Sequence, residues 1–167
     1  MSTPETLFSA EQIQERVRVM ARLIAAAPLV PDIAMPVLVG GFVFAADLLR
    51  ALSWEGVALD VEMIWLRSYG DKRVASAISM IAGPSEQIAG RHVLVIDGVL
   101  DAGRTIAKAV SLIKAAGAAS VQVAVILDKQ RPDAVAHADF VGFPIGKDFV
   151  IGYGMDDAGR YRGLPIP

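Results

Sequence analysis

The sequence contains no cysteine, which excludes disulfide bonds, thiolate-ligated zinc sites and cysteine nucleophiles. It has no uninterrupted apolar run of the roughly 20 residues that a membrane-spanning helix needs, because prolines and glycines break the richest stretch, 23–46. The formal net charge is only -2, so no nucleic-acid partner is expected. The chain does not open on a basic region followed by an apolar run, which predicts a cytoplasmic protein without a signal peptide or a membrane partner.

Apolar residues, by contrast, are abundant. Hydrophobic residues make up 54% of the 167 residues and charged residues 20%, so the chain is too apolar to be disordered. Its length favours a single domain spanning 1–167. The apolar surplus predicts a large core in which strands are buried on both faces, as in parallel sheets.

The first half of the chain begins with a helix. Ser9 and Gln12 have the spacing of a capping box, and regularly spaced apolar residues follow, which predicts a helix over 9–27. Three prolines then exclude a long helix in the next segment. The other elements expected before residue 90 are a short apolar run at 36–39, a helix at 42–52 and strands at 57–66 and 77–82.

The second half contains the clearest unit, a strand at 92–96, a helix at 106–116 that ends at Gly117, and a strand at 120–127. Such a unit implies parallel strands joined by a right-handed crossover. A further short strand is expected at 140–142. The fold class predicted is therefore α/β, with a twisted, mostly parallel sheet flanked by helices.

Ligands of open parallel sheets bind beyond the carboxyl ends of the strands, which directs attention to 39–41, 97–105 and 128–131. At the start of a helix, free backbone amides and the helix dipole favour a phosphate. Gly103 would let the backbone approach it, and Thr105 would add a hydroxyl. Asp97 and Asp101 would face hydroxyls, a proton or Mg²⁺. The alternative left open is that Asp101 is an ordinary helix cap and Gly103 an ordinary turn residue.

Several motifs, in order, resemble those of the type I phosphoribosyltransferases, most closely the hypoxanthine-guanine enzymes. Residues 93–105 are similar to the motif that binds phosphoribosyl pyrophosphate, and 38–41 to the pyrophosphate loop. Residues 67–70 are similar to the mobile active-site loop. The other resembling segments are Lys129 with 139–143 for the purine pocket, and 149–156 with 161–165 for the closing hood.

The resemblance implies a fold whose N- and C-terminal segments form a small hood, and an enzyme that transfers ribose 5-phosphate to N9 of hypoxanthine or guanine, with xanthine as a further candidate. Asp101 would be the catalytic residue, and Asp97 would hold ribose hydroxyls or Mg²⁺. The implied phosphoribosyl site is Asp97, Asp101, Ala102, Gly103, Arg104 and Thr105. The implied pyrophosphate site is Val39, Gly40, Gly41, Ser68, Tyr69 and Arg162. The implied purine site is Lys129, Phe140 and Val141.

The chain departs from the family pattern at four positions. Val39 stands where a lysine is usual, Gly98 where a second acid is usual, Ala102 where a threonine is common, and Lys147 where an aspartate is usual. Three hypotheses therefore stay open: a purine salvage enzyme, a nucleotide-binding or phosphoribosyl pyrophosphate-binding protein without turnover, and an RNA-binding regulator. Family analogy also implies a homodimer or homotetramer.

Overall fold

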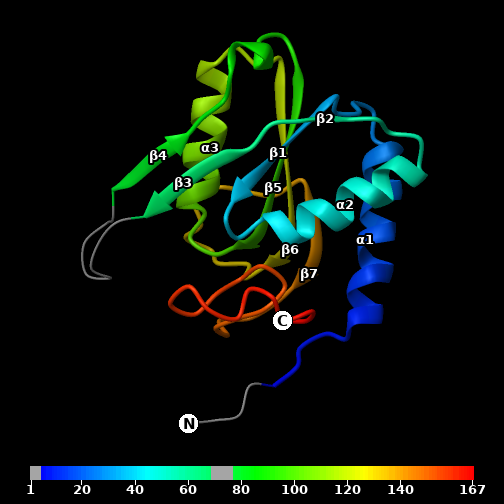
Figure 1. Ribbon diagram of the computed structural model, residues 1–167, viewed down its shortest axis with the longest axis vertical. Helices are drawn as coiled ribbons and strands as arrows, with labels where there is room; N and C mark the ends of the chain where they lie inside the picture. Colours follow the sequence, from blue (N-terminus) through cyan, green and yellow to red (C-terminus); the bar gives the residue numbers. More distant parts are fainter. Residues whose placement is uncertain (1–4, 69–76) are drawn as a thin grey trace.

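The computed structural model describes residues 5–68 and 77–167, whose elements are shown in Figure 1. The helices are α1 (Ala10–Ala25), α2 (Phe42–Trp54) and α3 (Arg104–Ala115), with a 3-10 turn at Glu86–Ile88. The strands are β1 (Ile33–Leu38), β2 (Asp60–Val61), β3 (Ile64–Ser68), β4 (Ile78–Ala82), β5 (His92–Leu100), β6 (Ser120–Asp128) and β7 (Phe140–Pro144).

The strands form one twisted sheet in the order β4-β3-β1-β5-β6-β7, with β2 paired to β1. All the pairs are parallel except β3 with β4. The predicted α/β class with a mostly parallel sheet is confirmed. In Figure 1, α1 and α2 lie on one side of the sheet and α3 on the other.

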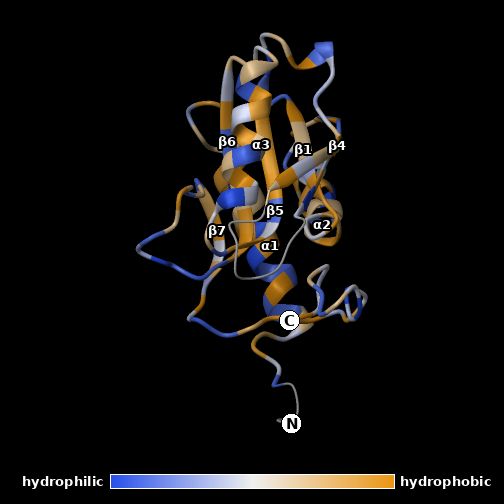
Figure 2. Ribbon diagram, turned by 90° about the vertical axis from the view of Figure 1, so that its left-hand side faces the viewer, coloured by the Kyte–Doolittle hydropathy of each residue, from blue (hydrophilic) through white to orange (hydrophobic). Residues whose placement is uncertain are grey.

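The centre of the sheet is buried on both faces, as the apolar surplus predicts. Leu94 and Ile96 of β5 pack into the core beneath α1 and α2, whereas Val93 and Val95 pack into the core beneath α3. All four are fully buried. Strand β5 is therefore anchored in the core on both faces, and Figure 2 shows its mostly hydrophobic colouring at the centre of the sheet.

Two predicted elements differ from the structure. The strand expected at 57–66 is wrong as a single strand, because β2 and β3 pair separately with the same edge of β1. The gap lies opposite Pro36, which has no N–H to donate to a neighbouring strand. The strand expected at 92–96 instead continues to Leu100, so that Asp97 lies inside β5 and not after it.

Helix α1 begins with the predicted capping box: the amide of Gln12 donates to the Ser9 hydroxyl, and the Gln12 side chain accepts from the Ser9 amide. The same helix also protects the edge of the sheet. Arg16 donates from Nε to the carbonyl of Gly142 at 2.6 Å and from Nη2 to the carbonyl of Val141 at 2.9 Å. Both carbonyls belong to β7, the last strand of the sheet, so this arginine satisfies acceptors that no further strand pairs with.

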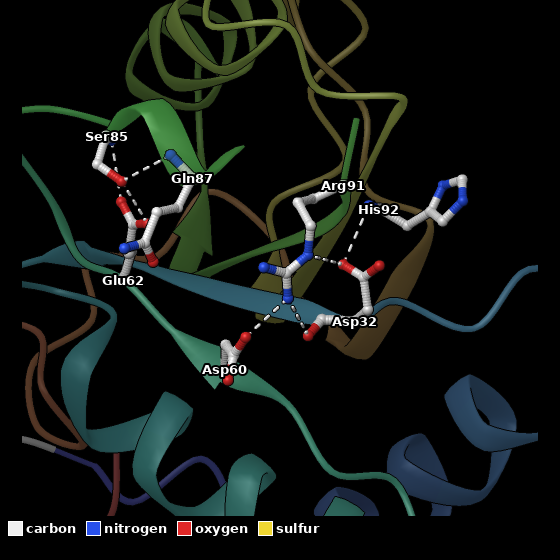
Figure 3. A network of polar contacts seen from close by, with 7 residues as sticks. All are labelled: Asp32, Asp60, Glu62, Ser85, Gln87, Arg91 and His92. Carbon is white, nitrogen blue, oxygen red and sulfur yellow. Dashed lines mark hydrogen bonds and ion pairs between the residues drawn. The ribbon is translucent and has the colours of Figure 1, made fainter. Parts of the chain in front are cut away.

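The amino ends of the central strands are joined by a polar network (Figure 3). Arg91 donates to Asp32 at 3.0 Å and to Asp60 at 2.9 Å, which links the start of β5 to the starts of β1 and β2. Beside it, the amide and hydroxyl of Ser85 donate to Glu62. These charges lie at the end of the sheet opposite to the carboxyl ends of the strands.

The carboxyl ends are covered by a hood. The amide of Leu7 donates to the carbonyl of Pro167 at 3.2 Å, which brings the N- and C-terminal segments together as expected. The C-terminal segment folds back on itself through short bridges, and it lies at the lower end of the molecule in Figure 1. Within the described residues, no helix is both long and apolar enough to span a membrane.

The contact between α1 and β7 leads to a prediction. The variant Arg16→Met should lower the free energy of unfolding by about 1.5–3 kcal/mol, because two strand carbonyls lose a charged donor. Denaturation in urea measures this value. Arg18→Met is the matched control on the same helix: among the described residues Arg18 makes only an exposed ion pair with Glu15, so the expected change is within about 0.5 kcal/mol. Equal effects of the two variants would contradict the role given to Arg16.

Candidate functional site

A cavity of about 420 Å³ opens at the carboxyl ends of β1 and β5. Ten of the side chains predicted from the sequence line it: Val39, Gly40, Ser68, Asp97, Asp101, Ala102, Gly103, Arg104, Thr105 and Arg162. The predicted phosphoribosyl and pyrophosphate residues therefore meet in one place, although they come from four separate segments of the chain. Of the remaining predicted pyrophosphate contacts, Tyr69 falls outside the described residues.

The turn between β5 and α3 has the form expected of a phosphate cradle. Gly103 precedes the first residue of α3 with φ at 82°, in the left-handed region that favours glycine. A Cβ at this position would also lie 2.9 Å from the amide nitrogen of Ala136. The turn therefore requires glycine twice over. It leaves the first amides of α3 and the Thr105 side chain at the cavity, with Arg104 exposed beside them.

Asp97 lies within β5 and lines the side of the cavity that the sheet forms. Its Oδ1 accepts the amide hydrogen of Gly98 at 2.7 Å. Burial raises the pKa of Asp97 to about 7, and the hydrogen bond from Gly98 offsets only part of that rise. Because burial disfavours the ionised form of Asp97, a bound cation would stabilise this carboxylate more than it would an exposed one. Within residues 5–68 and 77–167, no cluster of three or more acidic or histidine side chains forms a ready-made metal cage.

Three glycines bring the loop after β1 against the rest of the site. A Cβ on Gly41 would lie 2.6 Å from the carbonyl oxygen of Ile96. A Cβ on Gly98 would lie 2.9 Å from the carbonyl oxygen of Gly40, and one on Gly154 would lie 2.8 Å from the same atom. The Gly40 carbonyl is thus enclosed by β5 and by the hood, at distances that only glycine permits. This packing explains Gly98, which departs from the family pattern: an acidic side chain does not fit here.

Asp101 is held between two cations. Lys129 donates from Nζ to Oδ2 at 3.2 Å, and Arg131 donates from Nη1 to Oδ1 at 3.0 Å. Burial alone would raise the pKa of Asp101, but the hydrogen bonds from Arg131 and Lys129 outweigh burial and lower it. The carboxylate is therefore ionised near neutral pH. Asp101 is not a helix cap, because Gly103 takes that position.

The predicted purine contacts are only partly brought to the site. Lys129 reaches Asp101, but Phe140 and Val141 do not line the cavity. Phe140 pairs in register with Ala124, well before the carboxyl end of β7, and packs against the core beneath α1 and α2. The carbonyl of Val141 already accepts from Arg16. The purine contacts of Phe140 and Val141 stay predictions, in surroundings that do not favour them.

The three-residue sequence that contains Phe140 and Val141 occurs a second time, after the carboxyl end of β7. Asp-Phe-Val occurs at 139–141 and again at 148–150. At the first copy, Asp139 is tied to Val123 through both its amide and its carboxylate, as part of the sheet. At the second copy, Phe149 is 72% exposed. The flanking Lys147 and Asp148, where the family pattern is shifted, are also exposed and do not line the cavity.

The sequence assigned 149–156 and 161–165 to the hood, but it did not predict the contacts that fix the hood above the cavity. Asp156 lines the cavity and accepts from Arg162 at 3.3 Å, while Arg162 also donates to the carbonyl of Gly154 at 2.7 Å. The hydroxyl of Tyr153 donates to Asp47 of α2 at 2.6 Å. Burial and the Asp47 contact raise the pKa of Tyr153, so it remains a donor at any physiological pH. The glycines that flank Tyr153 were the only signal of this tight turn.

The packing around the Gly40 carbonyl leads to a second prediction. Gly98→Ala should lower the free energy of unfolding by about 1–3 kcal/mol, because the new methyl group overlaps a backbone oxygen that β5 and the hood both enclose. Thermal and urea denaturation measure the loss. Gly163→Ala is the matched control, since a Cβ there has no neighbour within 4 Å among the described residues. A Gly98→Ala variant as stable as the control would contradict the account of this contact.

Comparisons with known proteins agree with this site. Residues 7–158 match the phosphoribosyl transferase domain family. The hypoxanthine-guanine phosphoribosyltransferase of Bacillus subtilis is 34% identical, over 96% of this chain and 89% of that protein. The bifunctional protein TilS/HprT of Listeria innocua is 37% identical, but this chain spans only 25% of its length.

Solved structures give the same result. A variant of the hypoxanthine phosphoribosyltransferase of Trypanosoma cruzi, complexed with the product IMP, superposes with a TM-score of 0.87 at 33% identity, over 98% of this chain and 88% of that one. The Staphylococcus aureus hypoxanthine phosphoribosyltransferase superposes with a TM-score of 0.84 at 27% identity, over 97% of this chain and 88% of that one. The cavity, the glycine turn at the start of α3 and these likenesses together show that the chain belongs to the phosphoribosyltransferase family and resembles its hypoxanthine-guanine members.

Proposed function

We propose that the protein is a purine salvage phosphoribosyltransferase, which transfers ribose 5-phosphate from phosphoribosyl pyrophosphate to N9 of hypoxanthine or guanine. The observation that carries the proposal is the single cavity that joins the glycine turn of α3 to Asp97 and Asp101. Backbone amides at a helix start bind a phosphate, and an ionised carboxylate beside them can accept a proton. A sugar phosphate supplies the phosphate, and a 6-oxopurine supplies the proton.

In the proposed reaction, the new bond forms between N9 of the base and the anomeric carbon of the ribose, and pyrophosphate leaves with the electron pair of the broken C–O bond. The proton on N7 of the base passes to Asp101, which is ionised and can therefore accept it. Lys129 would donate to the 6-oxo oxygen of the same base. The amides at Gly103–Thr105 would hold the 5-phosphate, so that the anomeric carbon lies between the base and the leaving group.

Asp97 would hold Mg²⁺ together with oxygens of the substrate. Magnesium is commonly bound by one or two carboxylates and by substrate phosphates, which suits a site that offers few acidic side chains. The ion would supply positive charge opposite the leaving pyrophosphate. Arg162, fixed by Asp156 and by the Gly154 carbonyl, would add a second positive charge at the cavity. Val39 gives this part of the cavity an apolar wall in place of the lysine of the family pattern.

The hood and Ser68 would close the site. Ser68 ends β3 at the cavity, and the hood is anchored to α2 by Tyr153 and Asp47. Exclusion of water strengthens the electrostatic interactions within such a site and protects the reacting ribose from hydrolysis. A homo-oligomer is part of the proposal: large apolar side chains are exposed on α2 and on the β2 and β4 side of the sheet, namely Phe42, Trp54, Val61, Met63, Met80 and Ile81.

Formation of IMP and GMP tests the proposal directly. Purified protein with phosphoribosyl pyrophosphate and hypoxanthine or guanine should form nucleotide only when Mg²⁺ is present, and Asp101→Asn should lower kcat about 10²–10⁴-fold because it removes the proton acceptor. Asp60→Asn, which changes an exposed aspartate at the opposite end of the sheet, should keep most of the activity. Binding of nucleotide without any turnover would reject the enzyme and favour a nucleotide sensor.

A second measurement decides which aromatic side chain supports the purine. If exposed Phe149 stacks on the base, Phe149→Leu should raise KM for hypoxanthine about 3- to 10-fold, as expected for the loss of one stacking contact. Phe140→Leu should lower thermal stability and leave KM unchanged, because Phe140 packs in the core. The reverse pattern would assign the base to Phe140, as first predicted from the sequence.

A further inference from the structure

The loop that follows β6 wraps around the turn that carries Asp101. Its first amide, on Lys129, donates to the carbonyl of Leu100 at 3.0 Å, and the amide of Val135 donates to the carbonyl of Ala102 at 2.9 Å. The loop is therefore fixed to the residues on either side of Asp101. Its own shape is fixed as well, since the amide of Gln130 donates to the Asp128 carboxylate at 2.8 Å.

Arg131 is the side chain that this loop holds over Asp101. Asp133 binds the guanidinium at two points: Nε of Arg131 donates to Oδ1 of Asp133 at 2.9 Å, and Nη2 donates to Oδ2 at 2.8 Å. The remaining nitrogen, Nη1, donates to Oδ1 of Asp101. A two-point grip of this kind fixes the plane of a guanidinium, which a single contact does not. Arg131 thus meets Asp101 in a set orientation, despite its exposure at the surface.

The two oxygens of Asp101 have different partners, and the partners differ in freedom. Oδ1 faces Arg131, which Asp133 also holds, whereas Oδ2 faces Lys129, which has Asp101 as its one side-chain partner among the described residues. A carboxylate that must accept a proton from a base needs one oxygen free and the other held. Withdrawal of Lys129 to the 6-oxo oxygen of a purine would produce that arrangement.

We propose that Arg131 is a positioning residue for Asp101: it holds Oδ1 and keeps the carboxylate ionised, while Lys129 passes from Oδ2 to the purine and leaves Oδ2 to accept the N7 proton. This inference rests on the proposed purine phosphoribosyltransferase function. Among the described residues, the cations that act on Asp101 are Arg131 and Lys129. The other charged groups of the cavity are Asp97, Arg104, Asp156 and Arg162, and Asp133 lies behind Arg131.

The titration of Asp101 itself gives the first test. In ¹³C NMR of the ligand-free protein, the Asp101 carboxyl signal of Arg131→Met should titrate at a higher pH than in the unchanged protein, because burial is then opposed by Lys129 alone. Asp133→Asn should move the midpoint in the same direction by a smaller amount. Arg18→Met, which removes an equal charge from an exposed position on α1, should leave the midpoint unchanged.

The pH profile of turnover gives the second test. Removal of Arg131 should move the acid limb of kcat/KM to higher pH, since an ionised Asp101 is lost sooner as the pH falls. It should also lower kcat about 3- to 10-fold near neutral pH, because the orientation of the Asp101 carboxylate is then less well fixed. Arg131→Lys should fall between, because an ammonium cannot make the two-point contact with Asp133. KM for phosphoribosyl pyrophosphate should not change.

The outcomes separate the proposals. An unchanged NMR midpoint and an unchanged acid limb in Arg131→Met would overturn the role of Arg131. A raised KM for phosphoribosyl pyrophosphate with an unchanged midpoint would also overturn it, because Arg131 would then be a substrate contact. If the unchanged protein forms no nucleotide, the proposed function fails, and the NMR midpoint alone still decides whether Arg131 controls the ionisation of Asp101.

Discussion

The site depends on one close approach of backbone to backbone. The loop after β1 lies so near to β5 that neither Gly41 nor Gly98 could carry a side chain, and the hood meets the same Gly40 carbonyl through Gly154. Strand β5 can act as the fixed partner because it is buried on both faces by alternating apolar side chains. The fold therefore converts a property of the core, which is burial of a central strand, into the geometry of a cavity at its carboxyl end.

Within that cavity, the two aspartates of β5 and its turn have opposite environments. Burial dominates at Asp97 and raises its pKa to about 7, whereas two cations dominate at Asp101 and lower its pKa. A difference of this kind separates the roles of two like groups. Asp101 is ionised without help from a ligand and can accept a proton. The ionised form of Asp97, by contrast, is stabilised when a positive charge binds beside it. The division matches a reaction in which a base loses a proton while an anion departs beside a metal ion.

The sequence predicted the sheet, the capped first helix and the glycine turn, because each has a local signal: the continuous apolar run at 93–96, the Ser9 and Gln12 pair, and a glycine at the start of a helix. It failed where the outcome depends on contacts between distant segments. The break opposite Pro36 depends on which strand pairs with β1. Only the folded chain shows that the first Asp-Phe-Val copy enters β7, whereas the second follows the last strand. Arg131 has no motif of its own, and only the folded loop shows that it meets Asp101.

The most direct test of the whole account is a crystal structure of the protein with IMP. We expect the phosphate of IMP on the amides of Gly103–Thr105, and N7 of the base within hydrogen-bonding distance of Oδ2 of Asp101. Arg131 should still contact Oδ1, and Lys129 should have moved from Asp101 to the 6-oxo oxygen. A nucleotide bound with its phosphate away from the start of α3, or with Lys129 still on Asp101, would contradict the account.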